Sequence, residues 1–126
     1  MIATGTDILH IPRLQRALDH YGAAFLRRVF TVAEVAYCAG RVQPLAARFA
    51  AKEAASKALG VGMRVMSEFG IGWYEAEVLN DDKGRPVLYL HGRAAALAHE
   101  LHWRVWSLSL AHEREYAIAT VVATGG

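Results

Sequence analysis

The stretch that decides the fold runs from Arg48 to Gly62 and reads RFAAKEAASKALGVG. On a helix, at about 100° per residue, five alanines fall together on one face: Ala47, Ala50, Ala51, Ala54 and Ala58. Small side chains let a neighbouring backbone come close, so we expect this face to pack tightly. The opposite side carries the polar residues Arg48, Lys52, Glu53, Ser56 and Lys57.

The polar side of this helix has two interpretations. Glu53 and Lys57 form an i,i+4 pair in the favourable order, which contributes only about 0.2–0.5 kcal/mol on a solvated helix. In that interpretation the side is an ordinary surface. In the other it is a functional site, and the rest of the chain has to decide between them.

Composition limits the class of protein. The 126 residues suffice for one domain that buries a core without metals or disulfides. The single cysteine, Cys38, excludes an internal disulfide and suits a reducing compartment. We see neither a signal peptide nor an apolar run of membrane-spanning length. We therefore expect a single domain over residues 1–126 in a soluble, cytoplasmic protein.

Charge is distributed unevenly along the chain. Residues 1–60 carry 8 Lys/Arg and 4 Asp/Glu, whereas residues 61–126 carry 6 and 8. A basic first half indicates an acidic partner or phosphate groups. The net charge of +2 is too small to predict nucleic-acid binding.

The N-terminal segment MIATGTDI is predicted to form a strand that ends near Asp7. Asp7 either turns the chain before the next element or brings a carboxylate to the end of a strand, where sites are often built. A helix follows from Pro12. It carries Arg13, Arg16 and His20 on one side, with Arg27 and Arg28 beyond. This basic stripe is either a solvated face or a docking face for an acidic helix.

The remaining elements follow from capping, alternation and turn signals. Thr31 and Glu34 form a capping box that begins a short helix through about Cys38. Pro44 is expected to open the central helix. The segments that follow are a strand over 71–79, a returning strand over 86–90, a helix over 93–102, and strands over 105–110 and 116–122.

Helices and hairpin-linked strands without βαβ alternation predict an α+β fold, with helices on one face of a mainly antiparallel sheet. His99 and His102 have the spacing of metal ligands, but zinc needs a third ligand that is not apparent. His112 lies in the predicted tight connection 111–115, either solvated or facing a site. No Walker loop, dinucleotide fingerprint or serine nucleophile elbow is present. Any chemistry must therefore come from the charged residues.

Three stretches resemble the holo-[acyl-carrier-protein] synthases, the short bacterial 4′-phosphopantetheinyl transferases. They are GTDILHIPR (Gly5–Arg13), RFAAKEAASKALGVG (Arg48–Gly62) and SLAHEREYAIATVV (Ser109–Val122). Their order, spacing and the total length fit, so the resemblance covers the whole chain. It implies the 4′-phosphopantetheinyl transferase fold and favours a site on the central helix over an ordinary surface.

The resemblance implies a reaction at a pyrophosphate. Coenzyme A would donate its phosphopantetheine arm to a serine of an apo acyl carrier protein, and adenosine 3′,5′-bisphosphate would leave. Such chemistry needs charge neutralisation and positioning. Asp7 and Glu53 would hold one Mg²⁺, an ion that prefers few carboxylates with waters and phosphates. A metal-bound water or Glu53 would take the serine proton, and Lys57 would offset charge on the leaving phosphate.

The resemblance also implies contacts with coenzyme A and with the carrier. The coenzyme A set is Arg48, Ser56, Lys57, Gly60, Gly62 and His112, and the carrier set is Arg13, Arg16, Arg27 and Arg28. This chain departs from the family pattern at two positions. His10 stands where an acidic residue is common in the family, and Pro12 stiffens the entry to the first helix. These departures bear on the details of carrier docking.

The resemblance implies a homotrimer with its sites at subunit boundaries. With its 5 Tyr left out and its 11 Gly counted in, the apolar share of the chain is 74 of 126 residues, about 59%, above the roughly 45–50% of ordinary domains on the same basis. A buried subunit interface would use such an excess. The alternatives are a non-catalytic module that binds coenzyme A or a carrier, and a purely structural trimer. The choice between fatty-acid and polyketide carriers, tolerance of acylated coenzyme A, and Mg²⁺ against Mn²⁺ stay open.

Overall fold

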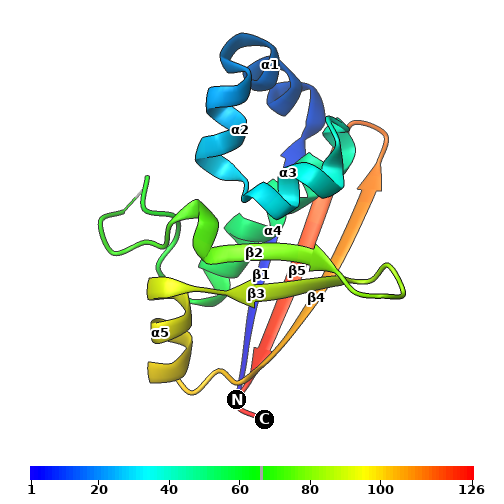
Figure 1. Cartoon of the computed structure of the whole chain (residues 1–126). Coiled ribbons are helices and arrows are strands. Elements are labelled where there is room, and N and C mark those ends of the chain that lie inside the picture. Colours follow the sequence, from blue (N-terminus) through cyan, green and yellow to red (C-terminus); the bar gives the residue numbers. More distant parts are fainter. Residues whose placement is uncertain (66) are drawn as a thin grey trace.

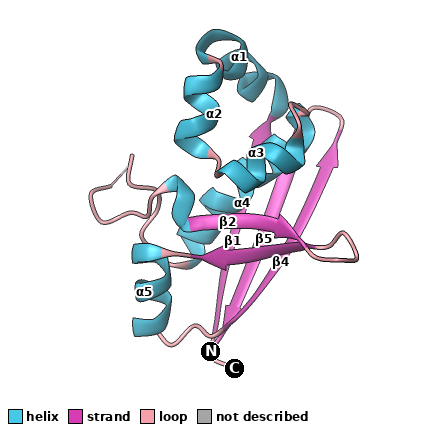
Figure 2. Cartoon of the chain, in the orientation of Figure 1, coloured by secondary structure: helices cyan, strands magenta, loops and turns pink. Residues whose placement is uncertain are grey.

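The computed structural model describes residues 1–65 and 67–126, and Figures 1 and 2 show how their helices and strands are arranged. The helices are α1 (Ile11–Tyr21), α2 (Ala23–Val29), α3 (Val32–Cys38), α4 (Val42–Ala58) and α5 (Gly92–Glu100), with a 3₁₀ turn, η1 (Trp73–Glu75). The strands are β1 (Ile2–His10), β2 (Ala76–Asn80), β3 (Pro86–Leu90), β4 (Val105–Glu113) and β5 (Tyr116–Thr124).

The main sheet is antiparallel, with strand order β1-β5-β4. Ile2 pairs with Thr124 and His10 with Tyr116, so the two ends of the chain lie side by side (Figure 1). Along β5 the alternate residues Ala117, Ala119, Val121 and Ala123 are fully buried. They face α4, whereas α3 and the β2-β3 hairpin lie over the other side of α4 (Figure 2). The predicted α+β fold is confirmed.

The contact between β1 and α4 is one of backbone on backbone. A Cβ atom added to Gly5 would lie 1.9 Å from the carbonyl oxygen of Ala54, so only glycine allows the two elements to come this close. Ala50, Ala51 and Ala54 are fully buried, which confirms the tight packing predicted for the alanine face. This contact places Asp7, two residues after Gly5, beside the same helix.

The opposite side of α4 is largely buried, which the sequence did not predict. Arg48 is 3% exposed, Lys52 0% and Ser56 2%. Lys52 Nζ donates to Glu34 Oε1 of α3 at 2.8 Å. The solvated-surface interpretation is therefore wrong for these three residues, because α3 and β2 cover them.

Several predicted boundaries are confirmed and others shift. The capping box is present, since Thr31 Oγ1 accepts from Glu34 N and Glu34 Oε1 accepts from Thr31 N. Cys38 is fully buried, and β3 has the predicted limits. The central helix begins at Val42 rather than at Pro44, because proline fits anywhere in a first turn, where N–H groups have no helical partner.

The segment before β2 was predicted as strand and is not. Residues Trp73–Glu75 form a 3₁₀ turn, and β2 begins at Ala76. Glu75 Oε1 accepts from Gly72 N at 2.7 Å, which stabilises the turn against the extended conformation. The predicted alternation holds only from Ala76 onward.

The last helix and the last hairpin also differ from prediction. Helix α5 ends at Glu100, and His102 lies beyond it with a left-handed φ of 64°. Strand β4 continues to Glu113, so His112 pairs with Ala117 inside the ladder instead of lying in a connection. The reversal is confined to Arg114-Glu115, where Arg114 has a φ of 56°. The short turn lets the strand pairing run three residues further than expected.

Candidate active site

A cleft of about 540 Å³ opens beside the crossing of β1 and α4. Its charged lining comes from three elements: Asp7 from β1, Arg13 from α1 and Glu53 from α4. Its apolar lining comes mainly from Ile8, Leu9, Leu14, Ala17, Phe25, Phe49, Met63, Val65 and Trp73. Two carboxylates 46 positions apart in the sequence therefore face one space.

Lys57 completes the charged cluster. Its Nζ atom donates to Asp7 Oδ1 at 2.8 Å and to the carbonyl oxygen of Thr6 at 3.1 Å. Glu53, four residues earlier on the helix, is not its ion-pair partner among the described residues. The solvated Glu53–Lys57 pair of the first interpretation is thus replaced by a pair between α4 and β1.

Burial and the negative charge of Asp7 both raise the pKa of Glu53. The cations Lys57 and Arg13 oppose this rise. Two carboxylates in one cleft repel each other when both are ionised. A cation placed between them would relieve that repulsion.

The donor set of the cleft fits Mg²⁺. This ion takes one or two carboxylates and completes its shell with waters and substrate phosphates. Asp7 and Glu53 supply that number of carboxylates. The described part of the chain contains no cluster of three or more His, Cys, Asp or Glu residues, so it offers no zinc-like cage, and the His99/His102 pair lacks a third ligand.

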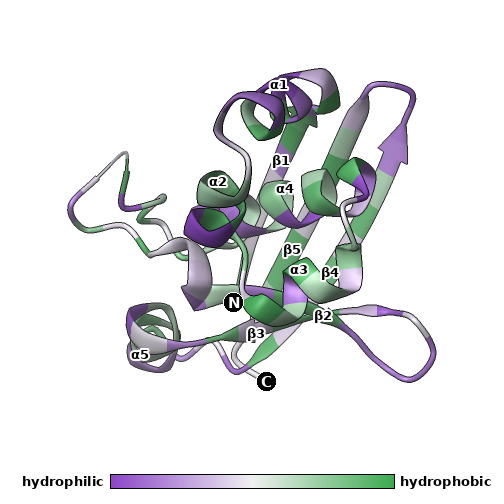
Figure 3. Cartoon of the chain, turned by 45° about the horizontal axis from the view of Figure 1, so that its top comes forward, coloured by the Kyte–Doolittle hydropathy of each residue, from purple (hydrophilic) through white to green (hydrophobic). Residues whose placement is uncertain are grey.

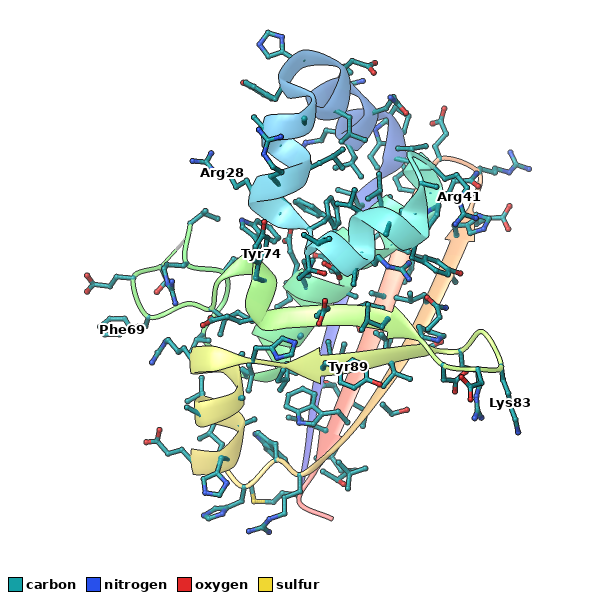
Figure 4. All side chains as sticks on the ribbon, viewed as in Figure 1. Arg28, Arg41, Phe69, Tyr74, Lys83 and Tyr89 are labelled. Carbon is teal, nitrogen blue, oxygen red and sulfur yellow. The ribbon has the colours of Figure 1, made fainter. Side chains whose placement is uncertain are left out.

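The four basic residues predicted to bind a carrier are all exposed on α1 and α2. Arg13 lines the cleft with Glu53. Arg28 lines an adjoining cleft of about 690 Å³, and its side chain points away from the body of the protein (Figure 4). Hydrophilic residues also lie along the outer turns of α1 (Figure 3). Because the four arginines are exposed there, this end of the molecule presents positive charge beside the cleft.

The remaining predicted residues have different settings. Arg48 is buried and donates to the carbonyl oxygens of Val78 at 3.2 Å and Pro44 at 3.3 Å. Ser56 Oγ donates to the carbonyl oxygen of Glu53 at 2.6 Å. Neither residue lines the cleft.

The two predicted glycines and His112 lie outside the cleft lining as well. Gly60 and Gly62 have φ values of 80° and 72° after the end of α4. The N–H of Gly62 donates to the carbonyl oxygen of Ser56 at 3.2 Å. His112 is exposed near the end of β4. The structure thus brings together Asp7, Arg13, Glu53 and Lys57, and leaves Arg48, Ser56 and His112 apart from them.

The cleft has three aromatic lining residues that were missed from the sequence, Phe25, Phe49 and Trp73. The rings of Phe49 and Trp73 lie 4.8 Å apart, and both line the cleft beside Glu53 and also the adjoining one. Phe49 precedes Glu53 by four residues, a spacing that places both on one helix face and could have identified it. Trp73 lies in the segment mistaken for a strand and carried no such signal.

The fold and the site define a class: a small α+β protein with two carboxylates in one cleft and a lysine bonded to one of them. The family model described as the 4′-phosphopantetheinyl transferase superfamily matches residues 3–121. The chain therefore belongs to this superfamily. Its relatives carry a more specific name.

The chain is 48% identical over 127 residues to the holo-[acyl-carrier-protein] synthase of Herpetosiphon aurantiacus, covering 99% of this chain and 100% of the relative. It is 43% identical over 125 residues to the same-named protein of Koribacter versatilis, covering 97% of each chain. Its fold is similar to the crystal structure of holo-[acyl-carrier-protein] synthase from Neisseria meningitidis, with a TM-score of 0.85, 34% identity and coverage of 98% and 99%.

A structure of the Helicobacter pylori holo-[acyl-carrier-protein] synthase in complex with coenzyme A is similar as well, with a TM-score of 0.84 and 28% identity. It covers 98% of this chain and 100% of that one. Among the described residues, no helix combines the length and apolar character that crossing a membrane requires.

Proposed function

We propose that the protein transfers the 4′-phosphopantetheine group of coenzyme A to a serine of an apo acyl carrier protein and releases adenosine 3′,5′-bisphosphate. The observation that carries this proposal is the convergence of Asp7 and Glu53 at one cleft, with Lys57 bonded to Asp7. Relatives named holo-[acyl-carrier-protein] synthase support it. The whole chain would act as one domain in the cytoplasm, in fatty-acid or polyketide biosynthesis.

Asp7 and Glu53 would together hold one Mg²⁺. When bound, the ion would neutralise charge on the pyrophosphate, and this is the main requirement of phosphoryl transfer. Glu53 would also act as the general base, because a carboxylate beside the attacking hydroxyl can accept its proton.

The serine hydroxyl oxygen would form a bond to the phosphorus that bears the pantetheine arm, and the bond from that phosphorus to the leaving bisphosphate would break. Glu53 would take the hydroxyl proton. The ammonium group of Lys57 would offset the charge that develops on the leaving phosphate oxygen. Because Lys57 is held on Asp7 at 2.8 Å, its position is fixed before the substrate arrives.

Coenzyme A would extend from this cluster over the end of α4. Gly60 and Gly62 leave the backbone accessible there, because neither carries a side chain. Buried Arg48 and Ser56 would act by holding the β2-β3 hairpin and the last turns of α4. His112, exposed on β4, would contact the nucleotide portion.

The carrier would dock on α1 and α2. An acyl carrier protein presents an acidic helix, and Arg13, Arg16, Arg27 and Arg28 are exposed on this side. Arg13 also lines the cleft, so the acidic helix would be bound close to the reacting centre. Such charge pairs raise the association rate and weaken with salt.

The protein would form a homotrimer with sites at the subunit boundaries. The face of the main sheet turned away from α4 supports this, because it exposes large apolar side chains in β1, β4 and β5. Ile2 is 68% exposed and Ile8 60%. A monomer would leave this apolar face in water.

Mass spectrometry tests the proposal. The protein is mixed with coenzyme A, Mg²⁺ and an apo acyl carrier protein, and the carrier is weighed before and after. We expect its mass to rise by one phosphopantetheine group. Binding of coenzyme A without this rise, while a known synthase modifies the same carrier, would instead favour the non-catalytic module.

A further inference from the structure

A completely buried ion pair lies next to the proposed catalytic carboxylate. Lys52 and Glu34 both have side chains with 0% exposure, and Lys52 Nζ lies 2.8 Å from Glu34 Oε1. Glu34 Oε2 accepts from the backbone N–H of Val78 at 2.9 Å. The reaction proposed above uses neither side chain, although Lys52 directly precedes Glu53.

Lys52 also holds the turn that forms one wall of the cleft. Its Nζ atom donates to the carbonyl oxygens of Trp73 at 2.9 Å and Ala76 at 2.8 Å. Trp73 is the first residue of η1 and Ala76 directly follows its last, so Lys52 bonds to both ends of this turn. An ammonium group has three N–H donors, so Glu34, Trp73 and Ala76 use all of them and none is left for a substrate.

The other two residues of η1, Tyr74 and Glu75, form hydrogen bonds to α2 and α5. The hydroxyl of Tyr74 donates to the carbonyl oxygen of Arg27 in α2, and Tyr74 points from the turn toward α2 (Figure 4). Glu75 Oε2 accepts from the backbone N–H of Arg93 at 2.9 Å. Among the described residues, the hydrogen bonds between this turn and α4 all come from Lys52.

The ring of Trp73 connects this framework to the cleft. It lies 4.8 Å from the ring of Phe49, and both rings line the cleft that contains Glu53. Lys52 thus bonds the wall of the cleft to the turn of α4 that bears the carboxylate. Burial of the pair excludes water from those bonds, which makes the connection rigid.

We propose that Lys52 is a positioning residue. Its hydrogen bonds to the carbonyl oxygens of Trp73 and Ala76 hold the Trp73 ring, which forms one wall of the cleft, in a fixed position relative to Glu53. The effect on catalysis rests on the proposed transferase function, whereas the effect on the wall does not. Glu34 has a different part, because it neutralises the buried ammonium group and joins α3 to β2. The two residues can therefore be separated by substitution.

The test compares Glu34→Gln with the double variant Glu34→Gln/Lys52→Met. The single variant leaves the buried ammonium group without its carboxylate, which is destabilising, but it keeps Lys52 bonded to Trp73 and Ala76. A loss that came from stability alone would therefore be at least as large in the single variant as in the double one. The double variant removes those two bonds as well. It leaves no lone buried charge, because the ammonium group and the carboxylate are both gone. Val121→Ala, a truncation at a fully buried position of β5, is the control for stability loss alone.

Two readouts separate positioning from stability. In a Trp103→Phe/Trp106→Phe background Trp73 is the sole tryptophan of the chain, and acrylamide quenching reports its exposure. Steady-state transfer gives kcat/KM. Both are measured at a temperature where circular dichroism shows every variant folded.

We expect quenching of Trp73 to increase and kcat/KM to fall at least about tenfold in the double variant. Glu34→Gln and Val121→Ala should keep the parental quenching and most of the activity. A folded double variant with parental quenching would overturn the proposal, as would equal losses in Glu34→Gln. If the parent transfers nothing, the proposed function fails, and quenching still decides whether Lys52 holds the wall.

Discussion

At the residue scale, the site depends on how three charges share a small space. Lys57 is 52% exposed at its side chain and its partner Asp7 is 13% exposed. A pair with one solvated partner contributes little to stability, on the order of 0–1 kcal/mol. Its importance is geometric, because it fixes an ammonium group and a carboxylate beside Glu53 before any substrate binds.

Neutralising either carboxylate should remove the activity and spare the fold. Asp7→Asn and Glu53→Gln each keep the side-chain shape but remove a ligand charge, so we expect transfer to fall at least about a hundredfold. The unfolding midpoint of Glu53→Gln should equal or exceed that of the parent, because a carboxylate with a raised pKa disfavours the folded state when ionised. Carrier mass and thermal unfolding measure the two effects. Asp82→Asn, an exposed carboxylate in the hairpin turn, is the matched control, and a variant of either site with parental turnover would exclude that residue as a ligand.

Arg13 should affect the carrier more than coenzyme A. Arg13→Glu reverses a charge on the proposed docking face, so the affinity for the carrier should fall and its salt dependence should weaken. Titration calorimetry with each ligand separately measures this. Arg104→Glu makes the same reversal at an exposed residue before β4 and should change neither affinity. Equal losses for both ligands in Arg13→Glu would contradict the docking face.

At the element scale, the crossing of β1 and α4 determines where Asp7 lies. Gly5→Ala places a methyl group 1.9 Å from the Ala54 carbonyl oxygen, so the two elements must separate. We expect a loss of about 1–3 kcal/mol or more in the free energy of unfolding, measured with denaturant. Gly72→Ala is the matched control, because its Cβ meets nothing closer than 3.5 Å. Equal stability of Gly5→Ala and the parent would show that this crossing is not tight.

The link from α3 to the hairpin should show in the pH dependence of stability. Burial raises the pKa of Glu77, but hydrogen bonds from Thr31 Oγ1 and His91 Nε2 outweigh it and the net pKa is lowered. A lowered folded-state pKa contributes stability above the unfolded value, about 4.3, and this stability is lost as pH falls through the folded value.

Glu77→Gln should therefore be less stable than the parent at pH 7, and the difference should shrink below about pH 4. Denaturant unfolding at several pH values measures it. Glu100→Gln, at an exposed position of α5, serves as the control. A difference that stays constant from pH 7 to the acid range would show that ionised Glu77 is not what stabilises the link.

Much of the element pattern could be predicted because its signals are local. The Thr31/Glu34 capping box and the alanine spacing of α4 depend on neighbours a few residues away. The burial of Lys52 could not be predicted in this way, because its partners Glu34 and Trp73 come from other elements. For the same reason the sequence suggested Lys57 with Glu53, whereas the structure pairs Lys57 with Asp7. Only the family resemblance brought Asp7 and Glu53 together in advance.

At the scale of the whole molecule, the open face of the main sheet predicts assembly. Sedimentation equilibrium should give three times the mass of one chain. Val122→Asp places a charge on the central strand of that face, whose neighbours are Thr4 and Ser107, and should give a folded monomer because a buried, unpaired charge is costly. Val32→Asp, at a residue of α3 that is 88% exposed, should stay trimeric. A monomeric parent, or a trimeric Val122→Asp variant, would contradict this assembly.

Transfer of phosphopantetheine at the cleft lined by Asp7 and Glu53 is the reaction that we propose for this protein. The most direct test follows both products in one reaction, with the carrier weighed by mass spectrometry and adenosine 3′,5′-bisphosphate quantified by chromatography. We expect equal amounts of holo carrier and bisphosphate from the parent, and at least about a hundredfold less of both products from Glu53→Gln in the same time. Bisphosphate release without a gain in carrier mass, or full modification by Glu53→Gln, would contradict it.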